Sequence, residues 1–141
     1  MFYGNPDNLD QLAGSISVLA ERVRDHTWSL VQRTSAIQWE STAADLFRQR
    51  VDLNATRLAD TATELDAVAA VIRVHAQTVR QHLQEIHRIE QTVTSWLAAA
   101  PHLAEDAAEG AALPVLARLP APGSKEWLHV GDTLRRMGVV V

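Results

Sequence analysis

The chain has 141 residues, of which 47% are hydrophobic, 5% aromatic and 21% charged, and its formal net charge is −4. This length suits one domain, or one domain with a tail, and the alanine-rich, aromatic-poor composition favours a folded helical protein. The acidic balance argues against a nucleic-acid binder that neutralises phosphates. The absence of cysteine excludes disulfides, thiolate zinc sites and a cysteine nucleophile.

The N-terminal sequence has neither a basic start nor an apolar core, so we expect no Sec-type signal peptide. No stretch approaches the run of about 18 uncharged apolar residues that a membrane-spanning helix needs. We therefore expect a chain that is cytoplasmic before any export and has no stable membrane insertion.

The first predicted element is an amphipathic helix over residues 7–37. Asn5 or Asp7 can cap its first N–H groups, and Pro6 suits a first helical turn. Apolar residues recur at every seventh position, which we label a in heptad notation. These a positions are Leu9, Ile16, Val23, Leu30 and Ile37. The matching d positions are Leu12, Leu19, His26 and Arg33.

A second, much longer helix is predicted over residues 42–100, with Ser41 as its cap and Pro101 as its stop. A helix of this kind would be about 85 Å long. Its a positions are all aliphatic: Val51, Leu58, Leu65, Ile72, Val79, Ile86 and Val93. Its d positions are mixed: Phe47, Asn54, Thr61, Val68, His75, His82, Ile89 and Trp96. Alanine occupies the e positions 55, 62, 69 and 76, so a close approach of two backbones is expected there.

The short break between these helices predicts an antiparallel helical hairpin in an all-α fold. In that hairpin His26 would face Asn54, and the polar residues His26, Asn54, His75 and His82 would line the seam and fix its register. The first helix would reach only to about residue 73, so the rest of the second helix needs another cover.

The last forty residues are the predicted cover. We expect a short helix over 102–112, a stiff proline-rich connector, and a last helix over 125–137 that Ser124 caps and Gly138 ends. The predicted organisation is thus a hairpin domain, residues 1–100, and a C-terminal extension, residues 101–141.

No pattern in the sequence predicts catalysis. The six histidines lack the spacing of a structural zinc site, and Glu126 with His129 forms only one of the two Glu-x-x-His pairs that a di-iron bundle needs. There is no Gly-x-Ser-x-Gly elbow and no glycine-rich phosphate loop. We expect no catalytic, cofactor-binding or metal site, no cofactor, and hence no enzyme.

The segment between the two predicted helices carries a family resemblance. Trp39 lies in the break, the small Ser41 follows two residues later, and Ala43, Ala44 and Phe47 continue the motif. This resembles the WXG family, the early-secreted-antigen-like helical hairpins of type VII secretion, over about residues 6–100. The family usually has glycine where this chain has Ser41.

The resemblance implies that the hairpin pairs with a second hairpin, of the same or a different chain, in a four-helix bundle. The interface would then contain the aliphatic a positions: Leu9, Ile16, Val23, Leu30, Val51, Leu58, Leu65, Ile72, Val79, Ile86 and Val93. The resemblance also implies engagement by the type VII export ATPase and secretion by that route. The family's Tyr-x-x-x-Asp/Glu signal does not follow the second helix, because the single tyrosine is Tyr3. This departure indicates a partner without the signal, or a protein that is not exported alone.

The leading interpretation is a non-enzymatic protein of type VII secretion that pairs with a partner hairpin. A chaperone, an adaptor or the targeting domain of a larger type VII effector is the first alternative, and the extra tail favours it. A generic coiled-coil scaffold is the second. A membrane-active hairpin ranks last, because the chain has a single lysine, Lys125.

Overall fold

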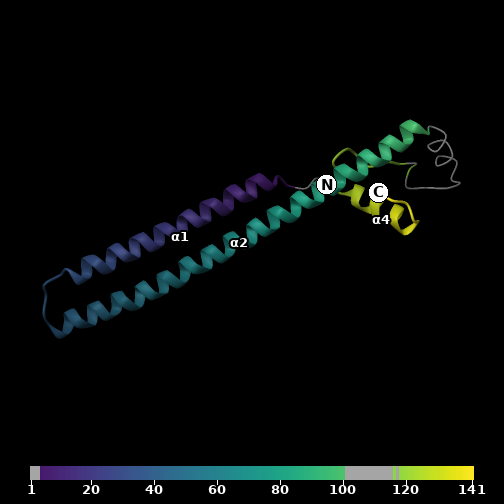
Figure 1. Cartoon of the computed structure of the whole chain (residues 1–141). Coiled ribbons are helices and arrows are strands. Elements are labelled where there is room, and N and C mark those ends of the chain that lie inside the picture. Colours follow the sequence, from purple (N-terminus) through teal and green to yellow (C-terminus); the bar gives the residue numbers. More distant parts are fainter. Residues whose placement is uncertain (1–3, 101–115, 117) are drawn as a thin grey trace. The chain divides into compact units, whose positions relative to one another are not determined.

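A computed structural model describes residues 4–100, 116 and 118–141. Its helices are α1 (Pro6–Ser35), α2 (Thr42–Ala99) and α4 (Glu126–Arg136), and none of the described residues forms a strand (Figure 1). The predicted all-α class and the very long second helix are confirmed. The helix predicted over 102–112 lies outside the described residues.

Both long helices begin and end for local reasons. Pro6 opens α1, and Asp7 and Arg33 complement the helix dipole in its first and last turns. After Ser35 the N–H of Ile37 donates to the carbonyl of Thr34, a tight turn that ends α1 before the predicted residue 37.

The start of α2 has the predicted cap. The N–H of Ala44 donates to Ser41 Oγ at 3.1 Å, which satisfies one of the free donors of the first turn. The helix then continues for 58 residues and ends at Ala99, two residues before Pro101.

The chain forms two compact units, and the division lies inside α2. One unit is Asp7–Ala76, which we call the helical pair. The other, the C-terminal unit, is Gln77–Val141 together with the N-terminal residues up to Pro6. This division differs from the predicted boundary at residue 100, because the second part of α2 shares a hydrophobic core with α4.

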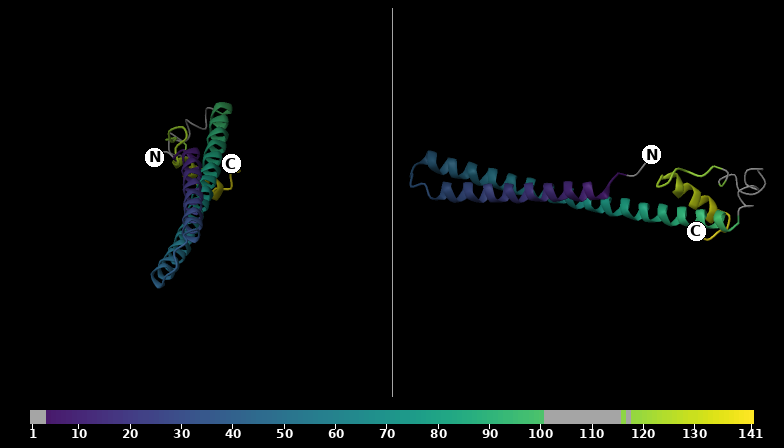
Figure 2. Two further views of the ribbon diagram at one scale, coloured as in Figure 1. Left: turned by 90° about the vertical axis from the view of Figure 1, so that its left-hand side faces the viewer. Right: turned by 90° about the horizontal axis from the view of Figure 1, so that it is seen from above.

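In the helical pair, α1 runs alongside the first part of α2 in the opposite direction (Figure 2). The most deeply buried residues of the pair are alanines, whose small side chains allow a close approach of the two backbones. The alanines with no exposed surface are Ala13, Ala20, Ala62, Ala69 and Ala76.

In the C-terminal unit, large side chains fill the core instead. The second part of α2 and the segment around α4 both contribute, as predicted for the cover of α2. The buried cluster comprises Ile86, Ile89, Val93, Leu116, Trp127, Val130, Leu134 and Val141. The indole N–H of Trp127 donates to the carbonyl of Ala121 at 3.1 Å, so this buried ring has no unpaired donor.

The last helix ends next to the predicted Gly138, but its N-cap position is Lys125, without a side-chain cap hydrogen bond, and not the predicted Ser124. Its first N–H, from Glu126, donates to Ser124 Oγ at 3.3 Å. Gly138 has a φ of +80°, the left-handed conformation that glycine adopts at helix ends. The predicted range of 125–137 is observed as Glu126–Arg136.

Candidate pairing surface

The helical pair buries a different set of heptad positions from the one that a simple coiled coil would bury. Its core residues occupy the a and e positions, while the apolar d positions stay outside the seam. These apolar d residues, each between 46% and 50% exposed, are Leu12, Leu19, Phe47 and Val68. The seam therefore runs between the a and e positions and leaves an apolar row uncovered.

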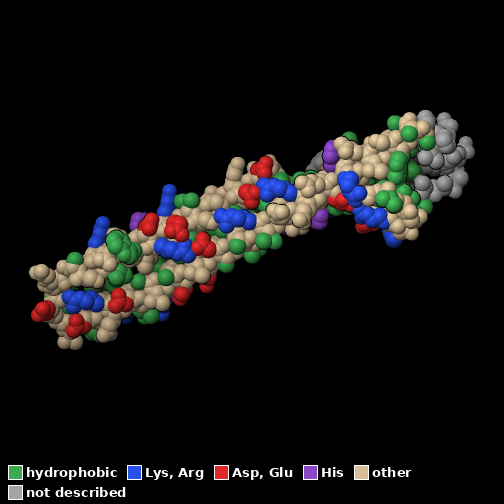
Figure 3. Space-filling view, viewed as in Figure 1, with side chains coloured by type: hydrophobic (Ala, Val, Ile, Leu, Met, Phe, Trp, Pro, Cys, Tyr) green, Lys and Arg blue, Asp and Glu red, His purple; other side chains and the backbone are tan. Residues whose placement is uncertain are grey.

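One side of the seam is closed by polar contacts. Arg24 Nη2 lies 2.6 Å from Asp66 Oδ2, and Arg73 Nη2 donates to Ser17 Oγ at 2.8 Å. All four residues occupy b positions of their helices, so we call this side the paired flank. Figure 3 shows basic and acidic side chains next to each other along the helical pair.

The Arg24 guanidinium of the paired flank is held in its charged form by its neighbours. The hydrogen bond to Asp66 raises the pKa of the Arg24 guanidinium above its already high usual value. Desolvation lowers this pKa by less, while the negative charges of Asp66 and Glu21 raise it further. Arg24 thus links α1 to Asp66 of α2 as a stable cation.

The d positions lie on the opposite side of the seam from the b positions, because on a helical wheel b and d flank the a and e positions. In two antiparallel helices whose b positions face each other, the d positions of both helices share the other side. We call that side the open flank. Its exposed apolar residues are Leu12, Leu19, Phe47 and Val68, with Leu30 and Leu58 from a positions at its edge.

The predicted polar seam is not formed within the chain. His26 and Asn54 are both exposed, and in the described part of the chain no hydrogen bond joins them. Alanines fill the seam, so the polar links are made by longer side chains on the paired flank. His75 is exposed as well, and His82 is partly buried in the C-terminal unit.

The predicted interface residues divide into two groups. In the helical pair Val51 is buried, most of the other a residues are partly buried, and Leu30 and Leu58 are exposed. In the C-terminal unit Val79, Ile86 and Val93 are buried. The prediction that Ile86 and Val93 contact a second chain is corrected, because both belong to the chain's own core.

The connector between α1 and α2 is fastened by a residue that sequence reasoning missed. Arg48 Nη2 donates to the carbonyl oxygens of Ile37 at 3.0 Å and Trp39 at 2.8 Å, and its Nη1 lies 3.1 Å from Asp45. The Trp39 side chain is 49% exposed, so its ring does not fill the end of the seam. An arginine in the second turn of the second helix was the only sequence signal for this anchor.

Of the other motif residues, Ala44 is buried, whereas Ser41, Ala43 and Phe47 are exposed. The motif therefore has one residue in the seam and the rest on the surface. A fixed backbone with an exposed indole suits recognition by another protein.

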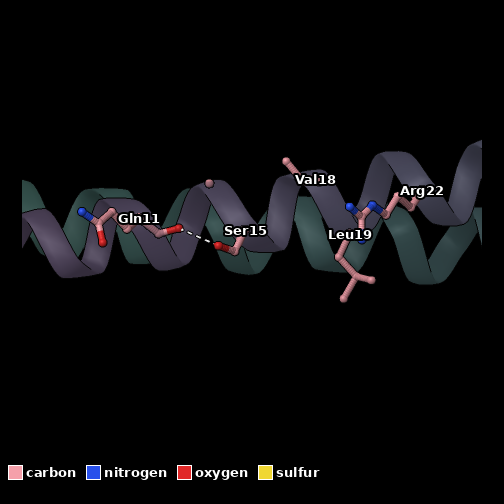
Figure 4. Close-up of a pocket in the computed structure, with 6 residues that line it drawn as sticks. Gln11, Ser15, Val18, Leu19 and Arg22 are labelled. Carbon is pink, nitrogen blue, oxygen red and sulfur yellow. Dashed lines mark hydrogen bonds between the residues drawn. The ribbon is translucent and has the colours of Figure 1, made fainter.

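A shallow depression runs along one side of α1. Gln11, Gly14, Ser15, Val18, Leu19 and Arg22 line it, and Figure 4 shows the Ser15 hydroxyl donating to the Gln11 carbonyl at 3.0 Å. All of these residues come from one helix, so this is an open groove rather than an enclosed ligand site.

Neither a metal centre nor a membrane span is found in residues 4–100, 116 and 118–141. No group of three or more histidine or acidic side chains there could hold a metal ion. Within the same residues, no helix is both long and apolar enough to cross a membrane.

No protein-family model matches this sequence, and no match was found among curated proteins or among solved structures. The class that the structure defines is an all-helical protein whose two paired helices carry an uncovered apolar flank. That surface is the strongest indication of its function.

Proposed function

We propose that this chain is a non-enzymatic helical hairpin of type VII secretion that pairs with a partner hairpin through its open flank. The observation that carries the proposal is the row of exposed apolar d residues, Leu12, Leu19, Phe47 and Val68, contributed by both helices to one side. Polar d residues such as Asn54 and Thr61 separate Phe47 from Val68, so the exposed apolar residues are spaced along the flank. Exposed apolar side chains gathered on one side of a helical surface are typical of an interaction site.

A second pair of helices is the partner that fits this flank. Two antiparallel helices that present d positions side by side form half of a four-helix bundle, and the other half would bury the row. Burial is favourable by roughly 25 cal/mol for each Å² of apolar surface removed from water. Such pairing would yield a dimer of hairpins.

The link to secretion is supported by the segment around Trp39. Its sequence resembles the WXG turn, and its indole is exposed on a connector that Arg48 holds in place. The resemblance implies that the type VII export ATPase engages the dimer, directly or through the partner. The protein would then be cytoplasmic before export and secreted with its partner.

A second candidate function is an adaptor, a chaperone or a targeting domain for a larger type VII effector. The C-terminal unit favours it, because α4 already covers the second part of α2 with the chain's own residues. Because α4 covers the second part of α2, a partner hairpin would pair with the helical pair alone. The C-terminal unit could then serve the adaptor, chaperone or targeting role.

An export assay tests the leading proposal. The tagged chain would be produced in a bacterium with an intact type VII system and in the same strain without the export ATPase. We expect ATPase-dependent export, and Trp39→Ala should lower the exported amount by roughly an order of magnitude, the usual weight of an interfacial tryptophan. The melting temperature should change by no more than about 2 °C, because the ring is exposed.

Trp28→Ala is the matched control, since Trp28 is 68% exposed on α1 and lies outside the connector. This variant should be exported normally. Export that does not need the ATPase, or an equal loss for both variants, would contradict the proposal and favour a generic coiled-coil scaffold.

A further inference from the structure

The open flank and its border carry more positive than negative charge. At the d and g positions of α1 and of α2 as far as Ala76, which form and border this flank, the arginines outnumber the acids: Glu64 is the only acidic residue at these helical positions. The arginines are Arg22, Arg33, Arg50 and Arg57, and all four are exposed. The apolar row is therefore bordered by positive charge on a chain whose net charge is −4.

These four arginines differ from the other arginines of the helical pair. None of them makes an ion pair or a side-chain hydrogen bond with any described residue. Arg24, Arg48 and Arg73, by contrast, all have partners within the pair. The unpaired cations are thus concentrated beside the uncovered apolar row.

The opposite side of the pair has the reverse charge. The b and f positions contain more acids than arginines, and the only arginines there are Arg24 and Arg73. The acids at these positions are Asp7, Asp10, Glu21, Asp45, Asp52 and Asp66. The pair is therefore polarised, with its positive side coinciding with its apolar side.

We infer that the partner of the open flank is a different helical hairpin, whose own apolar stripe is bordered by aspartate and glutamate, and not a second copy of this chain. The inference rests on the proposed pairing function and names its partner class. Two copies that met through this flank would bring two sets of unpaired arginines together, and like charges across an interface disfavour association. An acidic border on the partner would instead place a carboxylate opposite each arginine and would accelerate association.

A charge-reversed form of the full chain provides a defined probe for an acidic partner. The probe carries Arg22→Glu, Arg33→Glu, Arg50→Glu and Arg57→Glu and keeps the apolar row. Light scattering and a binding titration would be applied to the unaltered chain, to the probe, and to their mixture. The mixture should form a one-to-one complex at least about tenfold tighter than either chain forms with itself. This preference should shrink between about 50 mM and about 500 mM salt.

A control variant receives the same number of glutamates on exposed f positions, which lie away from the open flank: Gln49→Glu, Thr56→Glu, Thr63→Glu and Ala70→Glu. Circular dichroism would show that both variants keep their helices. The control should not bind the unaltered chain more tightly than the unaltered chain binds itself. Equal binding by control and probe, or no complex in the mixture, would overturn the inference.

Leu19→Asp separates this inference from the proposed function. A dimer of the unaltered chain as tight as the mixed complex, and abolished by Leu19→Asp, would overturn the acidic-partner inference while leaving pairing through the open flank intact. Association that Leu19→Asp does not weaken would overturn the proposed pairing surface, and the inference with it.

Discussion

The helical pair and the C-terminal unit use the same helix, α2, in different ways. In the helical pair, alanines such as Ala62 and Ala69 form a thin seam, and apolar d residues such as Val68 remain exposed. In the C-terminal unit the d residue Ile89 has no exposed surface, because α4 packs against it. One repeating pattern thus gives an uncovered surface in one unit and a closed core in the other.

The difference shows which of the two units leaves apolar d residues exposed to solvent. A seam of alanines buries less apolar area for each residue than a core of Trp127 and branched aliphatic side chains. Polar links also differ: Glu85 contacts both Arg88 and Arg135 in the C-terminal unit, and the N–H of Gly123 donates to Glu90. This difference supports the proposal that a partner would bind the helical pair.

Among the variants that test this comparison, Trp127→Ala should cause the largest loss in the free energy of unfolding. Trp127 is 2% exposed and central to the core of the C-terminal unit, so its removal should cost about 3–5 kcal/mol. Denaturant unfolding would measure the loss, and hydrogen exchange would place it in residues 77–141. A loss below about 1 kcal/mol, similar to that of the exposed Trp28→Ala control, would refute the closed core.

A smaller effect is expected from enlarging the alanine seam. Ala69→Leu adds three carbons at a site with no exposed surface, so it should force α1 and α2 apart and cost about 1–3 kcal/mol. Ala70→Leu is the matched control, because Ala70 is exposed and should change stability by no more than about 0.5 kcal/mol. Equal thermal stabilities of the two variants would show that the seam is not closely packed.

The smallest changes in stability are expected at two helical glycines, Gly131 and Gly14. A Cβ on Gly131 would overlap Ile89 Cδ1, and this isoleucine is enclosed in the core, so Gly131→Ala should lower stability by about 1 kcal/mol. A Cβ on Gly14 would meet nothing within 4 Å, so Gly14→Ala should raise stability by up to about 1 kcal/mol. Melting curves of both variants would compare them, and the same sign for both would contradict the close contact between α4 and α2.

Much of the local structure could be predicted from the sequence. Ser41 caps α2, Gly138 ends α4, and the regular aliphatic a positions indicate the great length of the second helix. These features depend on residues close together in the chain. The role of Arg48 escaped prediction, because its contacts with the carbonyls of Ile37 and Trp39 depend on how the connector folds back.

Local sequence patterns were enough to predict an all-helical chain with two long heptad-patterned helices, because helix formation follows from local propensity, caps and the spacing of apolar residues. Which heptad positions are covered could be learned only from the packing of the two helices. The choice between a seam at a and e and one at a and d depends on how closely two backbones approach, and that distance is set by pairs of residues far apart in sequence. The apolar d residues are exposed because the buried alanines place the seam at the a and e positions. These exposed residues are Leu12, Leu19, Phe47 and Val68.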